Sequence, residues 1–455
     1  MNIKSFLFVS VCLLFCSCDN EQMKEYNTLK VNEFIRDCMQ EAYLWSEQMP
    51  NLDINKESNP KQYFKKLLYS EDCWSYITDD AKSLTNSLKG IEMTFGYQLV
   101  FYKVTDDEYF AVVEYVVPNT AADRAGIKRG DYFVRINGEK INSNNYKNFV
   151  SASEITLTKG KWADSNVVET QENVSLTATT ETINPILLSK IMTKNGCKIG
   201  YLVYNSFIGD FNSSLEEVLR NFKENGVEEL VLDLRYNRGG DETASTFLCS
   251  SLAPKSVVES ESVLIRNHWN SNYESYWRSK GKTKLLERRF DKSVECNLNL
   301  NRLFVLTSKN SASASELTIV GLSPYMNVVQ IGQTTYGKYT SMFLFQPNLP
   351  TIKNWALLPI VAKYANSKGF TDFKDGLSPD YYVEDNLFPA VQLGDENEPL
   401  LAKAIEIITG DVSLSMQKIP TKFELLGSEF SKFDAIKQND FIKVPMHVLN
   451  ECEFD

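Results

Sequence analysis

Short apolar runs alternate with amphipathic helical segments between residues 199 and 331. The run Leu230–Leu234 is typical of a parallel strand buried within a sheet, and Ile199–Tyr204 is a strand-forming run before it. A capping pattern at Ser214 begins a segment between the two runs whose apolar residues recur at helical spacing: Leu215, Val218, Leu219 and Phe222. The alternation continues through Leu303–Leu306, a helix after Ser313, and Val328–Ile331. This pattern predicts an α/β fold with a parallel sheet.

Two differently patterned regions precede this core. Residues 29–88 read as helical, because Val31, Ile35 and Met39 fall on one helical face and a second helical piece leads into Cys73–Ile77. From about residue 90 strand patterns begin, over 97–102 and 110–117. At about 150 residues per domain, 455 residues fit about three domains. We expect a helical N-terminal domain at 29–88, a β-rich domain at 90–175, an α/β core at 176–410, and an extension at 411–455 with no assigned role.

The β-rich region carries a recognisable set of turns. The stretch Pro118–Asp131 combines an Ala-rich short helix with an Ala-Gly-Ile-Lys-Arg-Gly-Asp turn, and Phe133–Gly138 is a strand that ends in an Asn-Gly hairpin turn. This arrangement closely resembles a PDZ domain. The resemblance implies that Phe95, Gly96 and Tyr97 offer backbone N–H groups to a peptide carboxylate beside a free strand edge. A plain β-rich domain with common turns is the alternative.

The first residues resemble an export signal. Lys4 precedes the apolar run Phe6–Phe15, which has the length of a signal-peptide core and is too short to span a bilayer. Ser17-Cys18 follows, and it resembles a bacterial lipobox with cleavage before Cys18 and acylation of its thiol. We therefore expect a signal peptide at 1–17, a tether at 18–28, and a lipid anchor in the bacterial cell envelope, facing the periplasm or the cell surface. An ordinary secretory signal cut elsewhere is the alternative.

Composition narrows the possible chemistry. Lys plus Arg is 48 against 59 Asp plus Glu, a net charge of −11 with no strongly basic block, so we do not expect a nucleic-acid partner. The chain has two histidines, His268 and His447, which leaves little room for multi-histidine metal sites or a Ser-His-Asp triad. Six of the nine cysteines would remain after signal removal and lipidation, without metal or redox spacing: Cys38, Cys73, Cys197, Cys249, Cys296 and Cys452.

Three separated segments could carry chemistry, although each has a plain interpretation. Gly239-Gly240 follows a buried strand, where backbone N–H groups can point at a ligand oxygen, but such pairs often form simple turns. Ser313 lies between a strand and an apolar helix, and Ser313-x-x-Glu316 also matches a capping box, so Ser313 could be only an N-cap. Lys338 follows strand Val328–Gly332, and a single loop lysine is usually a solvated charge.

Together these segments resemble the carboxyl-terminal processing peptidases (tail-specific proteases), serine peptidases with a Ser/Lys dyad. The resemblance spans roughly residues 90–400 and includes Asp375–Asp380, which is like a Gly-x-x-Pro-Asp stretch of that family. It implies that Ser313 is the nucleophile and Lys338 the general base. It also implies an oxyanion hole formed by the backbone N–H of Ala314 with that of Gly239 or Gly240.

The resemblance has one departure and one physical demand. Many family members have Gln four residues after the lysine, where it helps to orient the amine, whereas this chain has Met342. Either Ser341 or Thr340 supports Lys338 instead, or the dyad works unaided. A lysine in water is almost fully protonated at pH 7, so a lysine base needs an apolar pocket that favours the neutral amine.

The sequence thus predicts a multi-domain α/β protein. The resemblance implies a crotonase-like α/β peptidase core, a PDZ domain inserted in or preceding it, and an N-terminal helical cap. The expected function is serine endopeptidase activity that cleaves proteins or peptides near their C-termini, without a metal, nucleotide or other cofactor. The alternative is a non-catalytic lipoprotein that binds peptides or hydrophobic ligands through its PDZ domain. A crotonase-type acyl-CoA enzyme is disfavoured by the export signal.

Overall fold

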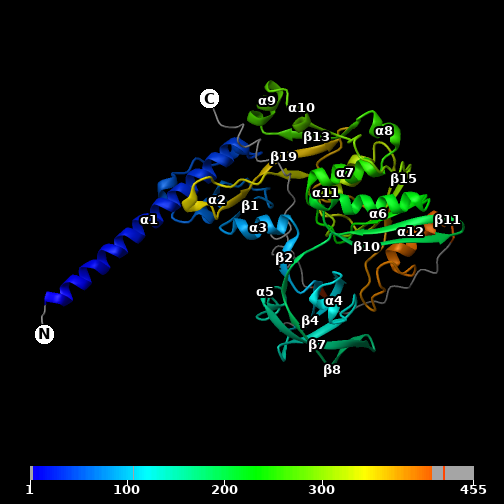
Figure 1. Ribbon diagram of the computed structural model, residues 1–455, viewed down its shortest axis with the longest axis horizontal. Helices are drawn as coiled ribbons and strands as arrows, with labels where there is room; N and C mark the ends of the chain where they lie inside the picture. The colour runs from blue at the N-terminus through cyan, green and yellow to red at the C-terminus, as the bar shows by residue number, and fades with distance from the viewer. Residues whose placement is uncertain (1–3, 106, 412–423, 426–455) are drawn as a thin grey trace.

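The computed structural model describes residues 4–105, 107–411 and 424–425 (Figure 1). A group of N-terminal helices lies on one side of an α/β core, and a β-rich domain lies below the core in this view. No helix in the described part of the chain is both long enough and apolar enough to cross a membrane.

The N-terminal segment is helical, as predicted, and packs on the core. It contains α1 (Lys4–Ala42), α2 (Pro60–Leu67) and α3 (Ala81–Leu88), with two short 3-10 turns, Ser46–Gln48 and Ile54–Lys56. The predicted apolar face of α1 is buried in one cluster with Trp269 and Leu357 of the core. The sequence-based interpretation misses a strand here, because β1 (Tyr76–Thr78) pairs antiparallel with β18 (Ala356–Leu358).

The core is built on a six-stranded sheet with the order β10-β11-β12-β15-β16-β20. Its strands are β10 (Ile186–Lys194), β11 (Cys197–Tyr204), β12 (Glu229–Asp233), β15 (Arg302–Thr307), β16 (Asn327–Gly332) and β20 (Tyr381–Tyr382). From β11 to β20 neighbouring strands are parallel, which confirms the predicted parallel sheet, and β10 is antiparallel to β11.

Helices cover both faces of this sheet. One hydrophobic cluster buries α6 (Asn212–Glu224), α7 (Glu242–Leu252) and α11 (Ala314–Leu322) against one face. A second cluster buries α12 (Pro399–Thr409) against the other. The chain leaves β15 and enters α11 at Ser313, and it leaves β12 and enters α7 through Gly239-Gly240, so both segments lie at the carboxyl ends of neighbouring parallel strands.

A second, antiparallel sheet has the order β14-β13-β19-β17. Its strands are β14 (Glu287–Arg289), β13 (Val263–Trp269), β19 (Ile360–Asn366) and β17 (Thr340–Met342). Short helices accompany it: α8 (Lys255–Glu259), α9 (Ser271–Ser279), α10 (Thr283–Leu286) and the 3-10 turn Pro350–Ile352. The Lys338 loop connects β16 of the first sheet to β17 of the second.

The β-rich domain has its own core and sheet. The strands are β3 (Tyr97–Thr105), β4 (Glu108–Val116), β5 (Tyr132–Ile136), β6 (Glu139–Lys140), β7 (Glu154–Ala163) and β8 (Asn166–Thr177), with short helices α4 (Ala121–Arg124) and α5 (Asn148–Ser151). Both predicted strands are confirmed as β3 and β4. A two-stranded antiparallel ribbon, β2 (Ile91–Thr94) with β9 (Thr179–Thr182), connects this domain to the core. Along the outer edge of β3 lies β21 (Glu424–Leu425).

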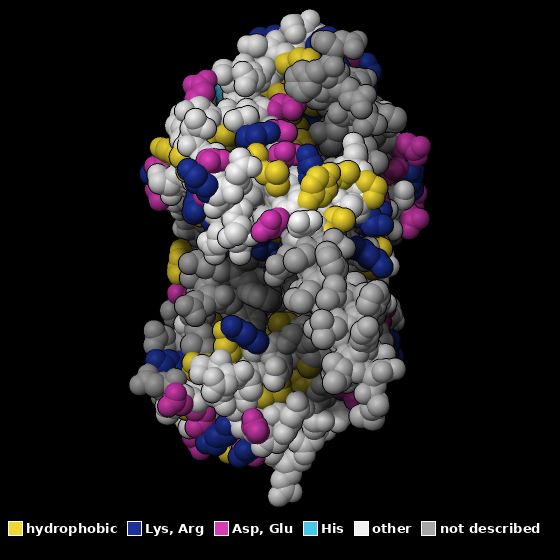
Figure 2. Space-filling model, turned by 90° about the vertical axis from the view of Figure 1, so that its left-hand side faces the viewer, with side chains coloured by type: hydrophobic (Ala, Val, Ile, Leu, Met, Phe, Trp, Pro, Cys, Tyr) yellow, Lys and Arg dark blue, Asp and Glu magenta, His cyan; other side chains and the backbone are white. Residues whose placement is uncertain are grey.

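The face from which α1 projects mixes charges of both signs. Figure 2 shows acidic and basic side chains interspersed on its described part, with a small group of hydrophobic side chains among them. Cys38, Cys197, Cys249 and Cys296 have free thiols, and Cys452 lies outside the described residues.

Candidate active site

Ser313 occupies the turn between β15 and α11 in an unusual backbone conformation. Its φ is +52° and its ψ is −108°, a region that residues with a side chain rarely adopt. Only 6% of the residue is exposed. Strain of this kind persists where the surroundings hold a residue in place, and it is common at functional sites. Ser313 is the N-cap residue of α11, so the capping position and the predicted nucleophile are the same residue.

Glu316 brings the predicted nucleophile and base together through their backbones. The N–H groups of Ser313 and Lys338 each donate to Glu316 Oε2 at 2.8 Å. The other carboxylate oxygen, Oε1, accepts from the N–H of Gly337 at 2.7 Å and the hydroxyl of Thr335 at 2.5 Å. One buried carboxylate therefore fixes the start of α11 and the whole Lys338 loop relative to each other.

Burial and hydrogen bonding act in opposite directions on this carboxylate. Burial raises the pKa of Glu316, the four donated hydrogen bonds lower it, and the net result is a pKa of about 7. Glu316 thus changes its protonation state near neutral pH, whereas an ordinary glutamate is ionised there.

Tyr364 of β19 forms a second link between the same two residues. Its hydroxyl lies 3.2 Å from the carbonyl oxygen of Ser313 and 3.1 Å from that of Lys338, and its proton is shared between these two acceptors. Ser313 and Lys338 are consequently held at both their N–H and C=O groups by two side chains from different elements.

The Lys338 side chain is buried, with 4% of the residue exposed. Its Nζ contacts the sulfur of Met342 at 3.4 Å, so the residue at the position of the family glutamine does touch the amine. A thioether is a weak acceptor. The hydroxyl of Thr340, one of the two residues expected to support Lys338, has no hydrogen-bond partner in the described part of the chain.

The glycine pair is tied to the serine turn by Asn237. The carbonyl of Asn237 accepts from the N–H of Ala312 at 3.2 Å and from the Ser315 hydroxyl at 2.9 Å. The Asn237 side chain accepts from the N–H of Gly239 at 2.8 Å, so this donor is already used. Within the described residues, the N–H groups of Gly240 and Ala314 donate no hydrogen bond. These two amides, rather than that of Gly239, are the better candidates for an oxyanion hole.

Close backbone packing explains the second glycine. Gly240 has φ +134°, and a Cβ atom on it would lie 2.1 Å from the carbonyl oxygen of Phe207. Only glycine fits both the backbone conformation and this contact.

A cavity of about 160 Å³ connects the predicted peptide-carboxylate loop to the glycine pair. Gly96, Tyr97 and Gln98 line it from the β-rich domain, and Arg238, Gly239 and Gly240 line it from the core. The N–H of Gly96 donates to the hydroxyl of Thr94 at 3.0 Å, so it is satisfied within its own loop. The two predicted sites therefore open into one space.

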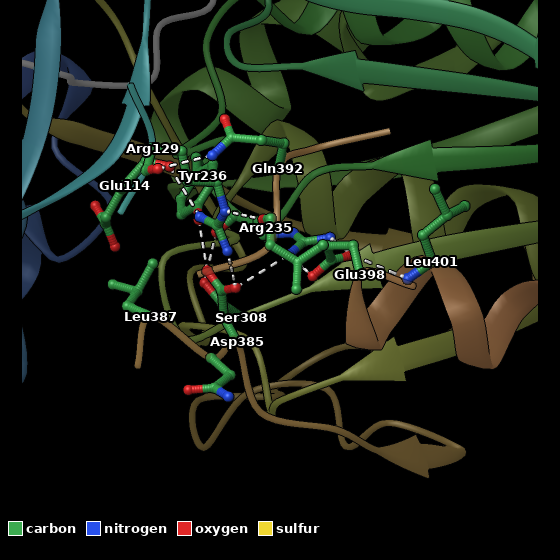
Figure 3. Close-up of polar contacts among 12 residues, drawn as sticks. Glu114, Arg129, Arg235, Tyr236, Ser308, Asp385, Leu387, Gln392, Glu398 and Leu401 are labelled. Atoms are coloured by element: carbon green, nitrogen blue, oxygen red, sulfur yellow. Dashed lines mark hydrogen bonds and ion pairs between the residues drawn. The ribbon is translucent and has the colours of Figure 1, made fainter. Parts of the chain in front are cut away.

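A buried polar network lies behind the glycine pair and reaches into the β-rich domain (Figure 3). Arg235, fully buried, pairs with Asp233 at 2.8 Å, with Glu398 at 2.6 Å and with Asp385 at 3.1 Å. Arg129, from the Ala-Gly turn, donates to Asp385 at 2.5 Å and also to the hydroxyl of Tyr236.

Arginine charges keep Asp385 of this network ionised. Burial alone raises the pKa of Asp385, but the positive charges of Arg129 and Arg235 outweigh that effect and lower the pKa to about 2. The strand end that leads into Asn237 and Gly239 is thus fixed to the turn of the neighbouring domain by ionised groups.

Sequence reasoning identified Ser313, Lys338 and the glycines but missed several residues that arrange them. The sequence marks Glu316 only as a capping partner, and no local pattern marks Tyr364, Asn237, Arg129 or Asp385 as part of the site. The short spacing Ser313-x-x-Glu316 was the one available signal. Within the described residues, no group of three or more His, Cys, Asp or Glu side chains is arranged to hold a metal ion.

The fold and site together have the architecture of a PDZ-containing serine protease, and the comparisons agree. The model of peptidase family S41 matches residues 198–383, that of the peptidase S41 N-terminal domain matches residues 30–76, and that of a PDZ domain matches residues 112–154. These matches give the chain the domain arrangement of peptidase family S41, with an N-terminal domain, a PDZ domain and a family S41 core.

Relatives and a solved structure show the same relationship. The chain is 26% identical over 303 residues to the carboxyl-terminal-processing protease of Picosynechococcus sp., covering 66% of this chain and 67% of the relative. It is 24% identical to the protein of the same name from Synechocystis sp.. This match covers 54% of this chain and 52% of that relative, so the chain spans about half of its length. A crystal structure of a Bacteroides fragilis protein assigned to the S41 proteases has 27% identity and a TM-score of 0.71, covering 84% of this chain and 98% of that one.

Proposed function

We propose that this protein is a serine endopeptidase that cleaves proteins or peptides near their C-termini, with Ser313 as nucleophile and Lys338 as general base. The observation that carries the proposal is the joint positioning of these two residues: Glu316 binds both N–H groups and Tyr364 contacts both carbonyl groups. A serine that serves only as a helix cap does not need this connection to a buried lysine.

The proposed reaction follows from these roles. The neutral amine of Lys338 accepts the proton of the Ser313 hydroxyl, whose oxygen attacks the peptide carbonyl carbon. The N–H groups of Gly240 and Ala314 stabilise the negative charge on the carbonyl oxygen. The ammonium of Lys338 then protonates the leaving amine, the C–N bond breaks, and water hydrolyses the acyl-enzyme with the same base.

Single and double substitutions test the dyad. Ser313→Ala and Lys338→Ala should each remove nearly all cleavage of a peptide with a free apolar C-terminus. The double variant should be hardly worse than either, because groups that act as a unit lose their effect together. A serine-directed acylating probe should label Ser313 in the parent protein, as located by mass spectrometry.

Two surface variants serve as controls. Ser323→Ala and Lys309→Ala change exposed residues of the same types and should leave the rate unchanged. If Ser313 is only a cap, Ser313→Ala should lower the unfolding free energy by roughly 1 kcal/mol while turnover per folded molecule persists. That result would overturn the dyad.

We also propose that the mature protein is lipid-anchored at Cys18 in the cell envelope, on the basis of the apolar run Phe6–Phe15 and Ser17-Cys18. The Cys18 side chain lies outside the described part of the structure. In cells fed a labelled fatty acid, the parent and Cys16→Ala should incorporate the label and sediment with membranes. Cys18→Ala should not incorporate the label and should be released or left unprocessed, whereas a Cys18→Ala protein as labelled and membrane-bound as the parent would contradict the anchor.

A further inference from the structure

The outer edge of β3 is not empty. On one side β3 pairs with β4, and on the other it pairs antiparallel with β21, so that Glu424 lies opposite Lys103 and Leu425 opposite Tyr102. Without β21, β3 would be the edge strand of this sheet, and an exposed edge is a template for another extended chain. The free edge expected from the sequence is therefore partly occupied by a segment of the same chain.

The direction of β21 matches the direction of a bound C-terminal peptide. As residue numbers rise from Glu424 to Leu425, their partners fall from Lys103 to Tyr102, toward Gly96 at the other end of the strand. A peptide that adds to β3 and places its carboxylate at Phe95–Tyr97 must also run antiparallel to β3 and toward Gly96. The segment β21 and a bound peptide strand would therefore hydrogen-bond to the same backbone groups of β3 and cannot occupy this edge together.

The other end of this edge reaches the glycine pair. Gly96, Tyr97 and Gln98, at the start of β3, line the cavity that also contains Gly239 and Gly240. One strand edge therefore connects the position of β21 to the space beside the glycine pair. A substrate that enters along β3 meets β21 first.

We infer that the segment Glu424–Leu425 is a built-in competitor that occupies the peptide-binding edge of the PDZ domain and restrains access of C-terminal substrates. This inference rests on the proposed peptidase function and adds a regulation to it. A segment tethered to its own site acts at an effective concentration on the order of millimolar. If the segment binds the edge with a dissociation constant of roughly 100 μM, it weakens the apparent affinity of the site for an external peptide about tenfold.

Peptide binding to the full-length Ser313→Ala protein tests this inference without consuming the peptide. In an antiparallel pair, neighbouring residues alternate in directing their N–H groups at the partner strand, so one of Glu424 and Leu425 donates to β3. The double change Glu424→Pro with Leu425→Pro removes that donor whichever residue provides it. The affinity is measured by fluorescence anisotropy with a labelled peptide that ends in a free apolar residue. The proline variant should bind this peptide about tenfold more tightly than the Ser313→Ala protein with an unchanged tail.

The matched control is Glu424→Ala with Leu425→Ala, which keeps both backbone N–H groups and should keep most of the competition. Of the adjacent Tyr102 and Lys103 amides, only one faces β21, and its hydrogen exchange should accelerate in the proline variant and not in the alanine variant. Equal peptide affinity in the parent, alanine and proline proteins, or no binding by the proline protein, would overturn the inference.

The two proposals fail in different ways. If the dyad assignment is wrong, Ser313→Ala still cleaves while the affinity ratio between tail variants stays about tenfold. If the tail inference is wrong, the affinity ratio is one while the parent protein still cleaves and Ser313→Ala does not.

Discussion

Glu316 combines a high degree of burial with four hydrogen-bond donors, and this makes it a pH-dependent element of the site. Its ionised form accepts from Ser313, Thr335, Gly337 and Lys338 together. A protonated carboxyl group must use one oxygen as a donor and cannot accept all four bonds equally well. The geometry of the dyad is therefore best defined when Glu316 is ionised.

Activity and stability should respond to this group in opposite directions. With a pKa raised to about 7, Glu316 in the folded protein binds a proton more tightly than in the unfolded chain, where the value is about 4.5. Its contribution to the unfolding free energy is thus fully present below about pH 4.5 and is lost as the pH rises through about 7, by up to roughly 3 kcal/mol. Cleavage should instead increase over the upper part of this range as the carboxylate forms.

Glu316→Gln tests both expectations. It removes the titration while keeping the size of the side chain, so the unfolding free energy measured by urea between pH 5 and 7 should vary less than in the parent. Its kcat should fall at every pH and lose the increase around pH 7. Glu261→Gln, at an exposed glutamate, is the control, and an unchanged pH profile for Glu316→Gln would contradict this role.

The residues that carry the proposed chemistry were predictable because their signals are local. Ser313 precedes an apolar helix, and Gly239-Gly240 follows an apolar strand, so each could be placed from neighbouring residues alone. Tyr364 lies 51 residues from Ser313 and 26 from Lys338, and its role exists only because β19 packs beside the site. No pattern in one sequence encodes such a contact.

At the scale of elements, the Ala-Gly turn of the PDZ domain does more than reverse the chain. Arg129 in this turn is buried, and it donates to Asp385, to the Tyr236 hydroxyl and to the carbonyl of Glu114 at 2.8 Å. The turn is therefore a joint between the PDZ domain and the strand end that precedes the glycine pair.

Arg129→Met should break this joint. It leaves the Asp385 carboxylate with one fewer positive partner in a buried site, and the unfolding free energy should fall by roughly 3–5 kcal/mol. Cleavage should fall as well, because the position of Tyr236 and the following residues is no longer fixed to the PDZ domain.

Lys128→Met provides the matched control, since Lys128 is the exposed neighbour in the same turn. Denaturant unfolding and peptide cleavage are measured on both variants. The difference between them gives the contribution of the Arg129 network, because both variants change the same turn. A stability loss below 1 kcal/mol for Arg129→Met would show that the network contributes little.

Element types were predicted well where periodicity was strong, as for β3, β4, β11, β12 and α6. The strand β1 was missed because it has three residues and exists only through its pairing with β18. Its strand character comes from a partner about 280 residues away, whereas the sequence around Cys73–Ile77 follows a helical segment and offers no alternation long enough to read.

At the scale of the whole molecule, three structural units meet at one site although they come from distant parts of the chain. The N-terminal helices pack on the antiparallel sheet that the Lys338 loop enters at β17, and the PDZ domain reaches the core through the β2–β9 ribbon and Arg129. The sequence predicted that these units exist and in which order they occur. It did not predict their contacts, because side chains such as Arg129 and Asp385 are 256 residues apart and pair only after the domains dock.

The pairing of Arg235 with Glu398 also has a consequence for the time at which the site can form during synthesis. The two residues are 163 positions apart, and at roughly 5–20 residues per second a ribosome needs roughly 8–30 s to add Glu398 after Arg235. Throughout that interval the arginine beside the glycine segment has no Glu398 to neutralise it, and α12 is absent from its face of the sheet. The polar network that fixes the strand end before the glycine pair is thus complete only after almost the whole core has been synthesised.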